Sequence, residues 1–383
     1  MRQFPVLMSK ENEIPTLSKL PELAEKMDMY VRNWLHYEAE ALRLHNKFGD
    51  KYILKCMSCG MTINAKMVDA KETVKKRLKI AKEDLEKARE KPVIGKYKCP
   101  KCGSTATALV FVPKDETVDQ ILQLYISQSE KYKKLAFEIV KKLPFYKFWL
   151  RYVHGAGESI AILLGFIVLR SFLRHNKFVT QAMWRMAGLV PWAYCPNCKT
   201  IVEKKWEKGM KCPKCGAELI SVLPTKRFGI KLDFNPTIRA RLLVSVETML
   251  QQQKKCLQKN GNCGVYYAAI QTQYASLVEK GKRKLKYLYP GFEKLSEEKQ
   301  QKILESWVFK SLRVILAKIL IEHASRIMAM YYDLPYTMPI RRDNHEIYNP
   351  LVDLNKYIET SGNKFIDLEQ SKLYLSRMKA YVS

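Results

Sequence analysis

Apolar residues recur along most of this chain three and four positions apart, the spacing that covers one face of an α-helix. Short stretches of alternating apolar and polar residues, which favour strands, interrupt this pattern twice. Pro144 and Pro335 follow two of the longest helical patterns and end them. Helices are therefore predicted over five segments: residues 1–50, 117–143, 237–259, 266–284 and 296–332.

A sixth helical pattern lies between the cysteines of the first strand-like stretch. Over residues 71–91 the apolar positions alternate in steps of four and three on an otherwise charged segment: Val74, Leu78, Ala81, Leu85 and Ala88. A seam with this period packs against a second helix. We expect it to find that partner within the chain or in a second copy, so this helix and the C-terminal helices are candidate homo-oligomer contacts.

Together with four Cys-x-x-Cys pairs, two in each strand-like stretch, and a Gly-x-Gly turn at residues 155–157, these patterns predict a mostly α fold with two inserted β-rich zinc ribbons and a helix-hairpin-helix centre. Its regions are a helical N-terminal region (1–50), a ribbon split by the heptad helix (51–113), a long helix with the hairpin domain (114–191), a compact ribbon (192–224), a helical C-terminal domain (225–340) and a polar tail (341–383).

The most apolar part of the chain is residues 145–191. A helix over 145–153, a turn at 154–157 and a buried helix over 158–169 are predicted there. The apolar run 160–169 is shorter than the roughly 20 residues that cross a bilayer. Residues 1–15 lack the continuous apolar segment of a secretory signal. We therefore expect a cytoplasmic protein with no membrane partner.

The charge balance changes this picture from a generic helical protein to a polyanion binder. The 383 residues hold 67 Lys and Arg against 38 Asp and Glu, a net charge of +29, with hydrophobic content of 47% that excludes wholesale disorder. A lysine-rich surface of a heat-adapted protein is the alternative, but there Glu normally rises with Lys. Membrane-surface binding would need an amphipathic basic helix or a lipid anchor, and the sequence has neither.

Eight of the ten cysteines form Cys-x-x-Cys pairs, which predict zinc rather than disulfides because no secretory signal precedes them. Each pair presents two thiolates from a tight turn, and two pairs complete a tetrahedron around Zn²⁺. Thirteen residues separate the later two pairs, whereas the earlier two enclose the heptad helix. Two zinc ions are expected, held by Cys56, Cys59, Cys99 and Cys102 and by Cys195, Cys198, Cys212 and Cys215.

Four cysteine ligands leave no open position on the metal, so neither site is expected to be catalytic. Redox chemistry of a single Cys-x-x-Cys pair is the alternative, and four pairs with ribbon flanks disfavour it. Cys256 and Cys263 are left over. They flank an Asn-Gly turn and either form a small-loop disulfide, as in some hyperthermophile proteins, or stay reduced. The knuckle rims are basic and are candidates to face phosphate: Lys101, Lys199, Lys204, Lys205, Lys211 and Lys214.

The turn His154-Gly155-Ala156-Gly157 between two apolar helices has the form of a helix-hairpin-helix motif. Its glycines allow backbone amides to approach a DNA phosphate, and the next helix adds the partial positive charge of its N-terminus. Two core helices joined by a glycine turn are the alternative. The predicted DNA contacts are the four turn residues with Arg151, Arg170, Arg174, Lys177, Arg239, Arg241, Lys282, Arg283, Lys284 and Lys286.

Several stretches in residues 145–335 carry a resemblance to a known family. The Gly-x-Gly hairpin is followed by Lys177-Phe178 and by the run Met183-Trp184-Arg185-Met186-Ala187-Gly188-Leu189-Val190-Pro191. This order resembles the C-terminal domain of the DEDD-type, bridge-RNA insertion-sequence transposases, in which a hairpin precedes a Gly-Leu-x-Pro segment. Three later stretches are similar too: 234–242, 266–280 and 307–323.

Two features of that family are missing here. Its members begin with a RuvC-like nuclease domain that carries four acidic residues, and residues 1–140 lack that pattern; acids such as Glu38, Glu40 and Asp50 have no supporting strands. The family's nucleophilic serine follows the Gly-Leu-x-Pro segment, where the compact ribbon interrupts this chain and Ser221 lacks the Ser-Gly context. Without carboxylates or a nucleophile, strand cleavage is not supported.

Two further features leave alternatives open. The run of residues 280–287 is the densest in basic residues and adjoins Tyr287 and Tyr289. It is either a phosphate-gripping segment with stacking surfaces or a solvated helix end. His323 lies in an apolar-periodic helix, where a core or interface histidine is favoured over a ligand.

The sequence thus predicts a transposase-derived protein that binds the DNA backbone without sequence preference and is not an enzyme. An archaeal mobile element, a virus, a plasmid or the nucleoid would be its setting. Two alternatives stay open. One is a recombinase subunit that completes its active site with a partner chain, and the other is a structured-RNA-binding module.

Overall fold

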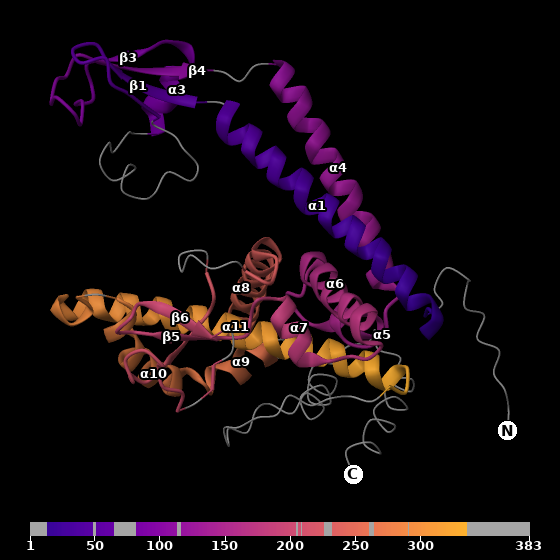
Figure 1. Cartoon of the computed structure of the whole chain (residues 1–383). Coiled ribbons are helices and arrows are strands. Elements are labelled where there is room, and N and C mark those ends of the chain that lie inside the picture. Colours follow the sequence, from indigo (N-terminus) through magenta and orange to yellow (C-terminus); the bar gives the residue numbers. More distant parts are fainter. Residues whose placement is uncertain are drawn as a thin grey trace. The chain divides into compact units, whose positions relative to one another are not determined.

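The computed structural model describes residues 14–48, 51–64, 82–112, 116–203, 206–207, 209–225, 232–259, 264–289 and 291–334. It is mostly helical with two small antiparallel sheets (Figure 1). The chain divides into two units. The ribbon unit is Arg32–Lys134, and the helical unit combines Met1–Val31 with Leu135–Ser383. The coarse prediction, a mostly α fold with two small β-rich inserts, is confirmed.

The ribbon unit contains the first sheet and parts of two long helices. The sheet order is β2-β1-β4-β3, all antiparallel, with β1 Lys51–Cys56, β2 Thr62–Asn64, β3 Val93–Ile94 and β4 Thr107–Val112. Helix α1, Leu20–Phe48, runs antiparallel to α4, Glu116–Lys141 (Figure 1). Within this unit their contact includes the stacked rings of Tyr37 and Tyr132, with centroids 5.7 Å apart.

The predicted heptad helix is seen only in its last part. Helix α3 spans Lys82–Glu90, and residues 65–81 lie outside the described residues. Ala88 on α3 packs with Tyr52, Leu54 and Leu109, which lie on β1 and β4. The described part of the segment, α3, therefore packs on the sheet, because the apolar side chains of β1 and β4 cover Ala88.

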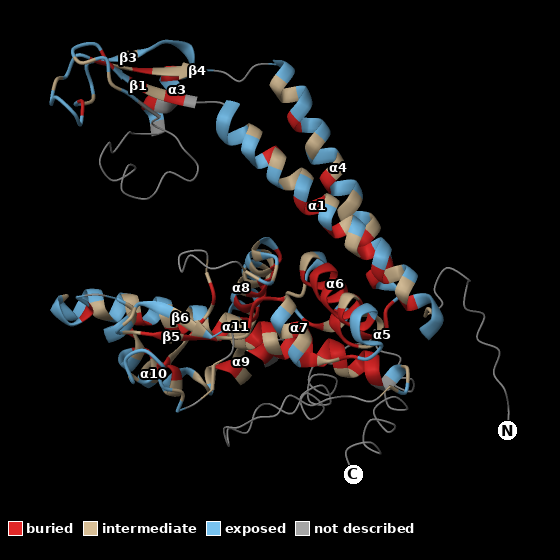
Figure 2. Ribbon diagram, in the orientation of Figure 1, coloured by how far each residue is buried: buried red, intermediate tan, exposed pale blue. Residues whose placement is uncertain are grey.

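The helical unit is built around α6, Glu158–His175, whose residues from Ile160 to Leu169 are all buried (Figure 2). A helix that is apolar all round belongs in a core, and α6 contacts α7, α8 and α11. The other helices that lie wholly in this unit are η2 Leu17–Lys19, α5 Pro144–Phe148, η3 Leu150–Tyr152, α7 Thr180–Met186, α8 Pro236–Gln258, α9 Val265–Gln271, α10 Tyr274–Leu288, η5 Phe292–Lys294 and α11 Glu297–Tyr331.

Two predicted helices are interrupted. The helix predicted over residues 145–153 is two short helices, because Trp149, at φ −141°, separates α5 from η3. The helix predicted over residues 266–284 is divided into α9 and α10, and the Thr272 hydroxyl donates to the Ala269 carbonyl at the break. Such a bond competes with the backbone ladder.

His323 is a core histidine, as predicted. It is 4% exposed, and its Nδ1 lies 2.8 Å from the Tyr266 hydroxyl, which in turn accepts a 2.9 Å bond from the Trp149 indole. Because a hydroxyl can accept two hydrogen bonds, the tautomer of His323 sets which of the two groups donates in the Tyr266–His323 bond. Burial holds the pKa of His323 well below its usual value, with a smaller contribution from Arg326. The network joins Trp149, α9 and α11.

Candidate metal centres and basic surfaces

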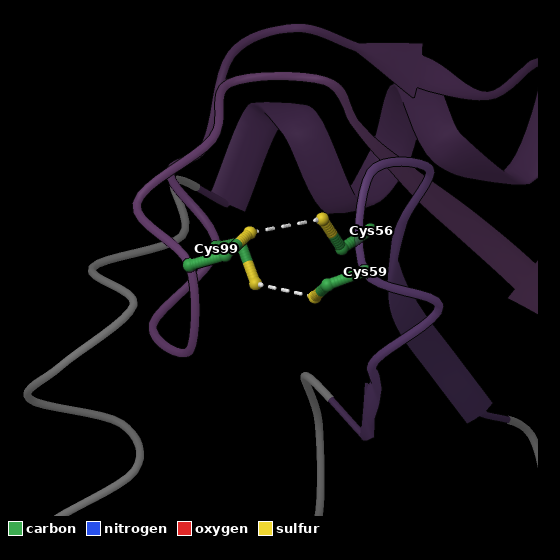
Figure 3. A group of neighbouring side chains, drawn as sticks. Cys56, Cys59 and Cys99 are labelled. Carbon is green, nitrogen blue, oxygen red and sulfur yellow. Dashed lines mark hydrogen bonds between the residues drawn. The ribbon is translucent and has the colours of Figure 1, made fainter.

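The structure brings the eight paired cysteines into the two predicted groups of four. In each group the sulfurs all lie within 4.8 Å of one another. Cys56 and Cys102 are 3.6 Å apart and Cys59 and Cys99 are 3.7 Å apart in the first group, where the sulfurs point toward one another (Figure 3). A tetrahedral ion with Zn–S bonds of about 2.3 Å separates its ligands by about 3.8 Å. The spacing therefore fits a metal ion of this size.

The second group lies beside the second sheet, whose order is β6-β5-β7. Its strands are β5 Trp192–Cys195, β6 Thr200–Glu203 and β7 Ile220–Val222. Cys195 and Cys215 are 3.5 Å apart, and Cys198 and Cys212 are 3.9 Å apart. These distances bracket the same tetrahedral edge, so the donor set matches that of the first group.

Three knuckles share one backbone hydrogen-bond pattern. The first cysteine's amide donates to the carbonyl five residues on, and the glycine after the second cysteine donates back to the first cysteine's carbonyl, at 2.8 to 3.0 Å. That glycine has a positive φ in each of the three, at Gly60, Gly103 and Gly216. In the fourth knuckle the corresponding residue is Lys199, at φ 55°, a conformation that disfavours side chains. The turn geometry is thus imposed even where glycine is absent.

In each group the knuckle amides favour the thiolate form of one cysteine, the form that binds metal. The backbone N–H of Cys102 is the main cause that lowers the pKa of Cys99 to about 6. In the second group the backbone N–H of Lys214 is the main cause that lowers the pKa of Cys212 to about 6. Because all four donors in each group are protein sulfurs, either site would be closed to substrate. The arrangement suits a structural ion.

A buried carboxylate that the sequence pattern did not single out fastens the first ribbon to α3. Asp84 is 2% exposed and accepts bonds from the Lys96 amine at 2.7 Å and the Tyr97 hydroxyl at 2.5 Å. These two donors lower the pKa of the Asp84 carboxyl. Tyr97 lies two residues before Cys99 of the second knuckle, and its carbonyl accepts from the Thr107 hydroxyl on β4. The network therefore positions that knuckle against the sheet.

The glycine turn of the predicted hairpin packs against α8. Gly155 has φ +78°, and a Cβ there would lie 3.1 Å from the Met249 Cα. The buried Gln253 side chain donates to the His154 carbonyl at 2.9 Å and accepts from the Tyr267 amide. Gly157 has open space around it and precedes α6. The first glycine is therefore explained by a close helix approach, while the His154 side chain and Gly157 are exposed.

Three of the predicted phosphate-binding cations use their charged groups inside the protein. Arg170 forms a 2.6 Å ion pair with Asp28. Arg239 donates to the Pro224 carbonyl at 2.6 Å and lies over the Phe234 ring, and burial lowers its pKa. Lys284 donates to the Ser221 carbonyl at 3.1 Å. Each of these contacts positions the chain beside α6 or beside the second ribbon.

The remaining predicted cations differ in their partners. Arg174, Lys177 and Arg283 are exposed and form no ion pair with any described residue. Lys282 pairs with Glu279 and Lys286 with Glu293, and the Arg151 guanidinium lies over the Tyr152 ring. Arg241 is half-buried, as is Ala156 of the turn. The rim lysines that the structure describes are all exposed: Lys101, Lys199, Lys211 and Lys214.

Parts of the prediction fall outside the described residues. Outside the described part lie Lys204, Lys205, Cys263 and the tail 341–383. Cys256, near the end of α8, is disulfide-bonded, whereas the eight cysteines of the two groups are free thiols. This agrees with the division of the cysteines into metal donors and a leftover pair.

One polar contact of chemical interest was not predicted. The Lys284 amine on α10 also donates to the hydroxyl of Ser221 on β7, which ties the helix to the second ribbon. Burial, and secondarily the charge of Lys280, lower the pKa of Lys284 to about 8. Only the fold brings these residues together, since 63 positions separate them.

Within the part of the chain that the structure describes, no helix is both long and apolar enough to span a bilayer. No protein-family model, no curated protein and no solved structure matches the chain.

Proposed function

We propose that this chain is a zinc-containing DNA-binding protein that grips the phosphate backbone with little sequence preference. In this proposal the helical unit derives from a transposase domain and performs no catalysis. The observation that carries it is the charge of +29 together with exposed cations that pair with no described acid, among them Arg174, Lys177, Lys199, Lys214 and Arg283. Unneutralised cations attract a polyanion because bound phosphates release their counterions.

The two ribbons supply rigid platforms for this charge. The second ribbon buries only a small core around Ala193, Cys195, Cys212 and Leu219, so a bound zinc ion would be needed to hold it. Lys199 and Lys214 then stand on fixed knuckle turns. The hairpin would contribute through the exposed His154 and the N-terminus of α6, because Gly155 faces α8 and the Gly157 amide donates to the Gly155 carbonyl at 3.1 Å. Contacts of this kind position a protein on the backbone and read no bases.

The test is the salt dependence of binding to a duplex. A protein that makes 6–10 phosphate contacts loses about 10³–10⁵ in affinity between about 50 and 200 mM salt. The double change Arg174→Gln with Lys177→Gln removes two unpaired charges, so the slope of log K against log salt should fall by about two. Titrations by fluorescence anisotropy measure it.

The control is Lys302→Gln, which removes one positive charge from a lysine already paired with Glu298 on α11. It should leave the slope unchanged. A flat salt response of the parent protein would overturn the proposal. Two duplexes of unrelated sequence should bind alike, and a structured RNA that binds more tightly than any DNA would favour the RNA alternative.

A recombinase is the second candidate, and the Ser221–Lys284 contact is the observation that favours it. An uncharged amine beside a hydroxyl can accept its proton as the oxygen attacks phosphorus. The Ser221 oxygen would then hold the DNA as a phosphodiester, and the displaced strand would leave as a hydroxyl. If this chemistry occurs, supercoiled plasmid is nicked and Ser221→Ala abolishes nicking. Equal nicking by parent and variant, or none by either, excludes this role for Ser221.

A further inference from the structure

The outer face of α10 carries cations and an aromatic ring at helical spacing. Lys280, Arg283 and Tyr287 lie at i, i+3 and i+7, which places them on one face. Tyr287 is 58% exposed, and Tyr289, one residue beyond the helix end, is 47% exposed. Neither ring stacks on an aromatic ring or forms a cation–π contact with any described residue. Such rings in water are available to an external ligand.

The inner face of α10 is fixed in place. A Cβ at Gly281 would lie 2.6 Å from Leu304 and 2.8 Å from the Trp307 ring, so α10 approaches α11 closely. Leu277 and Leu285 are buried on this side. The face that holds Arg283 and Tyr287 is therefore presented by a rigid helix rather than by a loop.

The acids near α10 neutralise other cations. Glu279 pairs with Lys282, and Glu293 pairs with Lys286. Arg283 has no acidic partner among the described residues. The positive charge of Lys280 repels that of Lys284 and contributes to the lowered pKa of Lys284. This face consequently keeps its positive charge beside the exposed rings.

We propose that the Lys280–Arg283–Tyr287 face, extended by Tyr289, binds unpaired nucleotides of a single-stranded nucleic acid. The proposal rests on the nucleic-acid binding proposed above and adds the form of ligand that this surface takes. Cations hold the phosphates while the tyrosine rings stack on bases, a combination typical of proteins that bind single strands without sequence preference. A duplex keeps its base faces inside the stack and could use only the cations.

The experiment compares two double variants of the full chain, Tyr287→Ala with Tyr289→Ala and Tyr287→Phe with Tyr289→Phe. The probes are a fluorescein-labelled oligothymidylate, a duplex and heparin, all at one salt concentration. The alanine pair should bind the oligothymidylate about tenfold or more weakly, since each stacked base contributes that order of affinity. The phenylalanine pair keeps the ring and should match the parent.

Duplex and heparin affinities separate the remaining outcomes. Both should be unchanged in the alanine pair, because neither polyanion offers an unpaired base. An alanine pair that keeps the parent's affinity for oligothymidylate overturns the inference, as does an equal loss for heparin. A parent that binds duplex but not oligothymidylate also removes this inference and leaves the proposed function standing. A parent that binds none of the three removes both.

A covalent readout locates the contact without relying on affinity. An oligothymidylate that carries one 5-iodouracil, irradiated on the parent protein, should cross-link to the peptide containing Tyr287 and Tyr289. Cross-links confined to other peptides would contradict the assignment. Because both tyrosines are exposed, thermal unfolding of the alanine pair should match the parent and confirms that the fold is intact.

Discussion

Loss of one cysteine ligand is expected to unfold the small sheet beside it and to halve the zinc content. In Cys212→Ser the second site loses one of its four donors, and the four-residue core of that ribbon cannot hold three short strands alone. Binding of structural zinc contributes on the order of 10 kcal/mol in small zinc domains, so this effect is larger than any single core contact. Metal analysis should fall from two ions per chain to one.

Hydrogen exchange localises the damage and provides the control. In Cys212→Ser, amides of β5 and β7 should lose protection while those of β1 and β4 keep theirs. Cys99→Ser should do the reverse, since its group belongs to the ribbon unit. A parent with fewer than two bound ions, or sheets that stay protected after chelation, would contradict the assignment of these groups as structural metal sites.

Substitution of Gly155 is expected to destabilise the helical unit, whereas the same change at Gly157 is nearly neutral. Gly155→Ala places a Cβ 2.9 Å from Gln252 Oε1 and 3.1 Å from the Met249 Cα, at a φ of +78°. The left-handed backbone costs roughly 1–2 kcal/mol with a side chain, and overpacking adds about 1–3 kcal/mol. Chemical denaturation should therefore show a loss of about 2–5 kcal/mol.

Gly157→Ala is the matched control because its Cβ meets no atom within 4 Å and its φ is −75°. Both glycines belong to the same turn. If the turn bound DNA through both of them, both variants would lose DNA affinity, whatever their stability. Equal stability of the two variants would show that the approach of α8 to the turn is wrong. A loss of DNA affinity confined to Gly157→Ala would support a backbone contact at the start of α6.

The metal centres show how far spacing alone can reach. A Cys-x-x-Cys turn is local, because its amides and its glycine lie within six residues. The sequence therefore predicted the cysteine pairs and which two pairs form each group of four. The left-handed Lys199 was not predicted, because glycine is the usual signal for that conformation. The segment 71–91 is a contrary case, because its apolar spacing predicted a helix as the partner and did not predict that a sheet would cover Ala88.

Charge was the feature in which sequence and fold diverged most. Arg170, Arg239 and Lys284 look from the sequence like Arg174 and Arg283, yet the first three bind Asp28, Pro224 and Ser221 within the protein. Those partners lie 142, 15 and 63 positions away. A linear pattern records the type of a side chain but not whether a distant carbonyl or carboxylate reaches it.

The sequence by itself determined the helical class, the two four-cysteine groups, the excess of positive charge and the core position of His323. Local spacing and composition are sufficient for these, because helix faces and knuckle turns are built from neighbours in the chain. Only the tertiary structure decided that Gly155 serves the packing of α8, that α10 keeps an unpaired cationic face with exposed tyrosines, and that Ser221 meets Lys284. These depend on contacts between segments far apart in the chain, where burial and hydrogen bonding select the partners.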